Sequence, residues 1–167
     1  MTVEIIKDKV TLRNLNPDDG RNIWELVKAC PPLDVNSCYS YLLLTEHFRD
    51  TCVVAEAEGK ILGYVSGYIL PKKENTLFIW QVAVSSEARG LGLAKRMINF
   101  LRDNVKERNV TCLETTITPS NTASQRLFQS LAETWDANCE KTILFTTEHF
   151  GEEGHEPEEC YRIGPWK

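Results

Sequence analysis

The stretch that decides the fold runs from Trp80 to Ala94 and reads WQVAVSSEARGLGLA. Its apolar first half predicts a strand, and the glycines at 90 and 92 predict a turn that opens into an amphipathic helix near Leu91. Glycine lets the backbone approach a ligand, and the first amides of a helix have no acceptor within it, so this turn can bind an anion. A plain strand-to-helix connection is the alternative, and the spacing alone does not decide between them.

Composition places the whole chain in the globular class. With 167 residues, 42% hydrophobic and 26% charged, it predicts a single domain over residues 1–167 with one core. The net charge of −5, without a basic stripe, argues against a nucleic-acid partner. We find no apolar run of about 18 residues and no signal-like start, so we expect no membrane association and a cytoplasmic protein.

The six cysteines stand at positions 30, 38, 52, 112, 139 and 160, and no two of them form a Cys-x-x-Cys pair. That spacing indicates neither a zinc site nor a disulfide framework. We therefore expect reduced thiols and no bound metal.

The first third of the chain predicts a strand followed by two helices. Residues 10–15 form the strand, and Asn16-Pro17-Asp18-Asp19 supplies a cap, a first-turn proline and acids for the first helix. Pro31-Pro32 ends that helix, and a second one begins at residue 36 or 37. The loop 33–37 and the two helices can form one wall of a substrate pocket. The first helix carries its apolar face on Ile23, Leu26, Val27 and Cys30.

The remaining elements alternate between strands and helices. Residues 51–57, 61–70 and 76–85 predict an antiparallel meander, and the helix after the glycine turn has an apolar stripe with a wetter side. The stripe comprises Leu93, Met97, Phe100, Leu101 and Val105, and the wetter side Arg96, Arg102 and Lys106. The later elements are a strand at 110–118, a helix at 122–130, a strand at 142–147, a polar loop at 148–157 and a strand at 159–163.

These elements predict an α/β (α+β) fold with a mixed central sheet of about six to seven strands and about four helices. A mixed sheet tends to splay where its parallel and antiparallel halves meet, and ligands favour such a gap. The glycine turn after residue 85 lies at that place in the predicted order.

The glycine turn and the elements around it resemble a known protein family. Residues 89–94, preceded by a Val-Ala-Val strand and followed by a strand and an Asn-x-Ala-Ser helix, resemble the acetyl-CoA-binding core of the GCN5-related N-acetyltransferases (GNAT). The family pattern Gln/Arg-x-x-Gly-x-Gly/Ala is met by Arg89, Gly92 and Ala94. The resemblance spans about residues 10–165. It implies the GNAT fold, with acetyl-CoA as co-substrate.

Five further blocks resemble one branch of that family, the diaminobutyrate acetyltransferases of ectoine synthesis. The blocks are PLDVNS at 32–37, FIWQVAV at 78–84, ETTITPSN at 114–121, HFG at 149–151 and RIGP at 162–165. This resemblance implies acetyl transfer to the 4-amino group of L-2,4-diaminobutyrate, by direct attack in a ternary complex. The product would be N4-acetyl-L-2,4-diaminobutyrate, which an ectoine synthase would cyclise, and the protein would be a homodimer.

The resemblance assigns acetyl-CoA to the strand and the turn. The strand aligns the pantetheine, an amide near Val82 stabilises the oxyanion, and the amides of 89–94 hold the pyrophosphate. Asn121 meets the pantetheine or an ordered water, although it also reads as a helix N-cap, and both roles are compatible. The residues expected at the cofactor are Val82, Ala83, Val84, Arg89, Gly90, Leu91, Gly92, Leu93, Ala94, Asn121, Ser124 and Phe128.

The substrate amine is mostly protonated, with a pKa near 10, so it must lose a proton before attack. Glu114 and Asp34 are candidates for that base or for binding ammonium groups, although each alone reads as a solvated acid. Trp80 can add cation–π attraction or belong to the core. The other expected substrate contacts are Thr115, Thr116, His155 and Glu158, and the last two alternatively belong to a charged, mobile hairpin.

One departure from the family pattern concerns the proton for the leaving thiolate. Many relatives carry a tyrosine where this chain has Phe128, and phenylalanine donates no proton. The acid would then be Tyr39, Tyr41 or another group, or the thiolate would take its proton from the amine. We predict Glu114, Tyr39 and Asp34 as the catalytic set.

Three alternative functions stay open at this stage. The chain can be a related acetyltransferase for another small amine, such as a polyamine or an aminoglycoside. It can be a non-catalytic acyl-CoA-binding module. Protein acetylation fits less well, because the loops that flank the site carry acids suited to a small dication.

Overall fold

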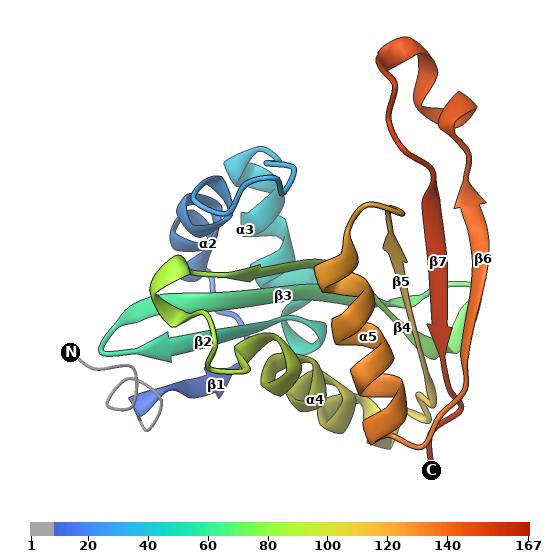
Figure 1. Ribbon diagram of the computed structural model, residues 1–167. Helices are drawn as coiled ribbons and strands as arrows, with labels where there is room; N and C mark the ends of the chain where they lie inside the picture. The colour runs from blue at the N-terminus through green and yellow to red at the C-terminus, as the bar shows by residue number, and fades with distance from the viewer. Residues whose placement is uncertain (1–8) are drawn as a thin grey trace. The chain divides into compact units, whose positions relative to one another are not determined.

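The computed structural model describes residues 9–167, apart from the side chains of residues 152 and 153. Its described strands follow the sheet order β1-β2-β3-β4-β5-β7-β6, as Figure 1 shows. Two compact units share this chain. Unit 1 takes in the described part of Met1–Tyr68 together with Trp80–Glu107, and unit 2 comprises Ile69–Ile79 and Arg108–Lys167, so β4 contributes to both.

The strands of unit 1 confirm the expected meander. β1 (Thr11–Arg13) pairs antiparallel with β2 (Val53–Ala57), which pairs antiparallel with β3 (Lys60–Leu70). β4 (Lys73–Val84) begins three residues earlier than expected, because the turn after β3 is confined to residues 71 and 72. Such tight connections are usual between neighbouring strands.

Two helices, α2 (Asp19–Lys28) and α3 (Cys38–His47), lie on one face of these strands in Figure 1. The predicted apolar face of α2 is confirmed, and it packs with Tyr41, Tyr64 and Ala83 into one core cluster. Ser37 caps α3 as its position predicts, accepting a hydrogen bond from the Ser40 amide. η1 (Arg49–Thr51), a 3-10 turn, follows α3.

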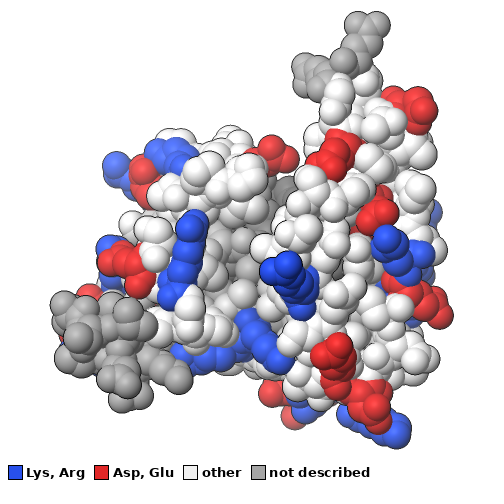
Figure 2. Space-filling model, viewed as in Figure 1, with Lys and Arg blue, Asp and Glu red and all other residues white. Residues whose placement is uncertain are grey.

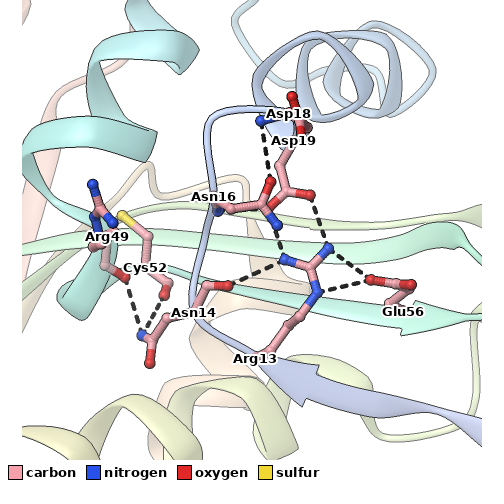
Figure 3. Close-up of polar contacts among 8 residues, drawn as sticks. All are labelled: Arg13, Asn14, Asn16, Asp18, Asp19, Arg49, Cys52 and Glu56. Carbon is pink, nitrogen blue, oxygen red and sulfur yellow. Dashed lines mark hydrogen bonds and ion pairs between the residues drawn. The ribbon is translucent and has the colours of Figure 1, made fainter.

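Figure 3 shows how β1, β2 and the start of α2 are joined through Arg13. Its guanidinium donates to both carboxylate oxygens of Asp19, each at 2.8 Å, and to Glu56. Asp19 is 4% exposed and also accepts from the Asn16 amide at 2.8 Å. The expected cap is therefore wrong in detail: the Asn16 side chain accepts from the Asp18 amide, and the helix begins at Asp19, after Pro17.

On the other face of the unit 1 strands lies α4 (Leu93–Val105), preceded by η2 (Ser86–Ala88) and followed by η3 (Lys106–Arg108). Its stripe is confirmed except that Ile98 is buried and Phe100 half-buried. Arg96 is also half-buried and donates to the Val10 carbonyl, so its placement on the wet side was wrong. Met97 lies against Gly63, where a Cβ atom would come within 2.8 Å of its methyl carbon.

Unit 2 contains a parallel pair of strands. β5 (Cys112–Ile117) runs parallel to β4 from Thr76–Cys112 to Ile79–Thr115. β7 (Glu158–Ile163) lies between β5 and β6 (Cys139–Phe145) and is antiparallel to both. α5 (Thr122–Thr134) runs four residues beyond its predicted end at residue 130. Its apolar positions Leu131 and Ala132 are buried, and this extra turn of core contact continues the helix.

The predicted polar loop after β6 is partly helical. η4 (Thr147–Glu153) is a pair of 3-10 turns joined at Gly151, and Figure 1 shows it at the far end of the β6–β7 hairpin. Phe145 contacts His149 and Phe150 edge-on there. The charges of this stretch predict a loop. The contacts among its aromatic side chains accompany the helical turns that the structure has there.

Candidate functional site

The amino-terminal end of α4 is the place where the sequence predicts an anion site. Gly92 is its N-cap with φ of 66°, and Gly90 has φ of 81°, both in the left-handed region that glycine favours. Apart from the adjoining residues, no atom of the described part of the chain lies within 4 Å of where a Cβ would stand on either glycine. The space beside this backbone is therefore open to a ligand.

The cap of α4 also differs from those of α3 and α5. Gly92 has no side chain with which to cap α4, whereas Ser37 and Asn121 cap α3 and α5. α2 likewise has no side-chain cap bond, but it carries Asp19 in its first turn, and α4 carries no acid there. The start of α4 thus has neither a capping side chain at its N-cap nor an acid in its first turn, which suits an external anion.

Basic side chains strengthen this preference. Arg89 follows η2 and stands next to Gly90. Figure 2 shows Lys and Arg side chains over the region of η2 and the start of α4. Cations are unfavourable at the positive end of a helix dipole, so an anion bound there relieves that repulsion. A diphosphate fits this charge.

Strand β4 supplies the neighbouring backbone within unit 1. Ala83 is 1% exposed and belongs to the core under α2 and α3, so alternation assigns Trp80, Val82 and Val84 to the opposite face. Trp80 is 48% exposed, which excludes the interpretation as a core tryptophan. The Ser85 amide donates to the Leu62 carbonyl at 2.8 Å, so the end of β4 is bound to β3.

The loop between α2 and α3 presents an acid beside this strand. Asp34 is exposed, and its backbone carbonyl accepts a hydrogen bond from the side chain of Gln81 at 2.7 Å. Tyr39, on the first turn of α3, is 66% exposed. Tyr41 is 1% exposed and donates its hydroxyl proton to Gln81, so it is not free to act as a general acid.

Glu114 of unit 2 is 6% exposed and is paired with two cations. Its Oε1 accepts from Lys73 Nζ at 2.8 Å and from Arg162 Nη1 at 2.6 Å. Burial opposes ionisation, but the hydrogen bonds from Lys73 and Arg162 outweigh it and lower the pKa of Glu114. A carboxylate with a lowered pKa is a weak base, and this geometry favours a structural role.

The threonines that follow Glu114 alternate across β5. Thr115 is 3% exposed and donates its hydroxyl to the Ile79 carbonyl at 3.0 Å, whereas Thr116 is half-buried. The Thr115 hydroxyl proton is committed to the strand pair. Thr116 is the more accessible of the two predicted substrate contacts.

The start of α5 is shaped by Asn121. Its Oδ1 accepts from the Ser124 amide at 3.1 Å, so the capping role is present, and its exposed side chain keeps its amide donor. Phe128 is 2% exposed and packs into the core of unit 2. The structure therefore gives no support to Phe128 as a cofactor contact, because its position two turns into the helix turns the ring inward.

The two late candidates lie at the loop end of the β6–β7 hairpin, next to η4. His155 stacks on Phe150 with ring centroids 3.9 Å apart, and Glu158, half-buried, begins β7. Glu156 accepts from the Ser120 amide at 3.1 Å and from its hydroxyl. This segment is thus tied to the turn before α5, in contrast to a mobile, purely charged hairpin.

A family model supplies the identification. The model described as Acetyltransferase (GNAT) family matches residues 21–132, which include the glycine turn and the start of α5. The chain belongs to the acetyltransferase (GNAT) family. The expected fold class is confirmed as well, since the described residues form the mixed, open sheet flanked by helices that this family implies.

Three relatives of this GNAT chain carry a more specific name. The L-2,4-diaminobutyric acid acetyltransferases of Halomonas elongata and Chromohalobacter salexigens are each 50% identical to it, covering 93% and 96% of the chain and 81% and 84% of the relatives. The diaminobutyrate acetyltransferase EctA from Paenibacillus lautus, solved with L-2,4-diaminobutyric acid and coenzyme A, is 41% identical. Its TM-score is 0.89, over 93% of this chain and 95% of that one.

Sequence reasoning missed the buried polar residue that hydrogen-bonds the Asp34 loop, Gln81. It is 6% exposed, and a polar residue inside the apolar run IWQVAV was the available signal, because buried amides require hydrogen-bond partners. Among the side chains that the structure describes, no group of three or more His, Cys, Asp or Glu is arranged to hold a metal. None of the helices in the described residues is long and apolar enough to cross a membrane.

Proposed function

We propose that this protein transfers the acetyl group of acetyl-CoA to the 4-amino group of L-2,4-diaminobutyrate. The product is N4-acetyl-L-2,4-diaminobutyrate, an intermediate of ectoine synthesis. The observation that carries the proposal is the glycine-capped, acid-free start of α4 after β4, in a chain 50% identical to named diaminobutyrate acetyltransferases. The relative solved with both diaminobutyric acid and coenzyme A supports the same substrate pair.

The acetyl donor is bound by unit 1. The amides from Arg89 to Ala94 hold its diphosphate, and Arg89 adds a positive charge. The pantetheine follows Val82–Val84, where a backbone amide polarises the thioester carbonyl. Leu91 and Leu93 are buried, so they contribute their backbone and their packing rather than a side chain to the donor.

The acceptor is held by acids and an aromatic ring. Asp34 is exposed in a loop that Gln81 fixes, and it binds one ammonium group of the diamine. Trp80 offers an exposed indole face for cation–π attraction. Thr116, His155 and Glu158 are proposed as further contacts on the strength of the resemblance, and Thr115 only through its backbone.

Proton transfer needs a base for the ammonium and an acid for the thiolate. Asp34 is the proposed base, acting directly or through water, because Glu114 is engaged by two cations. Tyr39 is the proposed acid, since its ring is exposed and Tyr41 is committed to Gln81. A Tyr39→Phe variant with unchanged turnover would remove that candidate and leave proton transfer from the amine to the thiolate.

The decisive experiment is an amine panel with acetyl-CoA, following thiol release and identifying the product by mass spectrometry. The panel contains diaminobutyrate, a polyamine, an aminoglycoside and a peptide. We expect the highest kcat/KM for diaminobutyrate and acetylation at its 4-amino group. Preference for another amine would show a different acetyltransferase, and tight acetyl-CoA binding without turnover would show a binding module; either result overturns the proposal.

We also propose that the protein is a cytoplasmic homodimer that serves a response to osmotic stress. β6 is the last strand in the sheet order and is exposed along its length, with Ile143, Leu144 and Phe145 between 45% and 64% exposed. An exposed apolar edge strand favours pairing with another copy. A light-scattering mass of one chain would contradict the dimer.

A further inference from the structure

The loop that carries Asp34 is held from three directions within unit 1. The Asp34 carbonyl accepts from Gln81 Nε2 at 2.7 Å, and the Asn36 carbonyl accepts from Trp24 Nε1 of α2 at 3.1 Å. The Asn36 amide donates to the Tyr41 hydroxyl at 3.4 Å. An exposed acidic loop is thereby bound to β4, α2 and α3.

Gln81 is the centre of this set of contacts. Its Oε1 accepts the Tyr41 hydroxyl proton at 3.2 Å, so both ends of its amide are engaged. Gln81 and Tyr41 are 6% and 1% exposed. The Gln81 backbone amide donates to Ser66 Oγ of β3 at 3.1 Å, which fixes the strand on which the side chain stands. Buried hydrogen bonds of this kind are costly to break, because water does not replace the lost partner.

The position of Gln81 in β4 links the two halves of the proposed reaction. Its neighbours Trp80 and Val82 point to the other face of the strand, where we place acceptor and donor contacts. Its side chain crosses to the Asp34 loop. A displacement of that loop would move the carboxylate of Asp34 relative to the backbone that holds the thioester. Reaction rates are sensitive to such shifts of about 1 Å.

We propose that Gln81 is a positioning residue, which sets the place of Asp34 against strand β4 and so determines affinity for the diamine. The inference rests on the proposed function, because it requires Asp34 to bind the acceptor. It assigns no contact with substrate to Gln81 itself. It also gives Tyr41 a role through Gln81 in place of the acid role that the sequence left open.

The test compares Gln81→Met with the unchanged protein in steady-state kinetics. Methionine fills a similar volume without hydrogen bonds. We expect the KM for diaminobutyrate to rise about tenfold, with the KM for acetyl-CoA within about twofold. Amide hydrogen exchange of residues 33–37 should become faster. Thr51→Val is the matched control, because Thr51 is 5% exposed and donates to the Gly67 carbonyl at 2.7 Å; it should lower stability without changing either KM.

Tyr41→Phe is the second variant should Gln81→Met not fold. It keeps the ring and removes the hydroxyl, so it should raise the acceptor KM by a smaller factor and leave the pH profile of kcat unchanged. A general acid would instead change that profile.

A double-mutant cycle separates positioning from a general loss of structure. If Gln81 acts through Asp34, Gln81→Met should add little to the acceptor KM of Asp34→Asn. Additive effects, or a wild-type acceptor KM in Gln81→Met, would overturn the inference. A protein that turns over no diaminobutyrate would overturn the proposed function instead, and hydrogen exchange in Gln81→Met would still decide whether Gln81 anchors the loop.

Discussion

At the residue scale, Glu114 shows that the chemical role of a carboxylate depends on the groups around it. Its place in a resembling block suggests a catalytic base, but Lys73 and Arg162 hold the carboxylate ionised. Because its pKa is lowered in the folded state, its stabilising effect is present above the ordinary value of 4.5 and is lost as pH falls through the folded value.

We predict that Glu114→Gln lowers the free energy of unfolding by about 1–3 kcal/mol at pH 7, because two cations lose a charged acceptor. The difference from the unchanged protein should shrink on acidification, as urea unfolding at several pH values would show. The ascending limb of the pH–rate profile should keep its position. Loss of that limb in Glu114→Gln would restore the role of general base.

Asn121 has two compatible roles that one pair of variants separates. Serine caps helices about as well as asparagine, whereas alanine does not. We predict that Asn121→Ala lowers stability by about 1 kcal/mol and Asn121→Ser by much less. If the exposed amide also contacts the pantetheine, both variants should raise the KM for acetyl-CoA. A wild-type KM in Asn121→Ser would leave Asn121 with its cap alone.

At the scale of elements, the turn between β4 and α4 has a backbone conformation that favours glycine, at the place where we propose that the diphosphate binds. Gly92 holds a left-handed φ at the N-cap, and only glycine does so without steric cost. The helix begins two residues later than the sequence suggests, after η2 and the two glycines. This leaves the loop backbone, rather than a side chain, facing the ligand space.

We predict that Gly92→Ala costs about 1–2 kcal/mol and raises the KM for acetyl-CoA at least about fivefold, because the amides are re-aimed. Gly59→Ala is the matched control: Gly59 has φ of 79° and open space around it, in the β2–β3 turn. It should cost similar stability and leave the KM unchanged. Equal KM effects in both variants would contradict the anion site.

At the scale of the molecule, the chain passes between the two units after residues 68, 79 and 107. Neither unit is a continuous stretch of sequence. We therefore propose that residues 1–167 behave as one folding domain, as the length of the chain predicts. A single cooperative unfolding transition by two independent probes would support this proposal, and two separate transitions would contradict it.

Variants at the Arg13 contacts of Figure 3 would measure how much an ion pair with a buried carboxylate contributes to the stability of the protein. We predict that Asp19→Ala lowers the free energy of unfolding by about 2–4 kcal/mol, since Arg13 loses two of its hydrogen bonds and the Asn16 amide loses its acceptor. Glu25→Ala, which breaks the exposed pair with Lys28, should cost less than about 0.5 kcal/mol. Neither should change the KM for acetyl-CoA. Equal costs would contradict the role of burial.

The sequence by itself determined the family, the order of strands and helices, and the glycine turn, because periodicity, caps and glycine positions act over a few residues. Only the tertiary structure decided the burial and the partners of individual side chains. Trp80 is exposed, Phe128 is buried, Tyr41 is bound to Gln81, and Glu114 is held by two cations. The hydrogen-bond partners of Tyr41 and Glu114 lie about 40 residues or more away in the chain. Local sequence patterns do not indicate contacts over such separations.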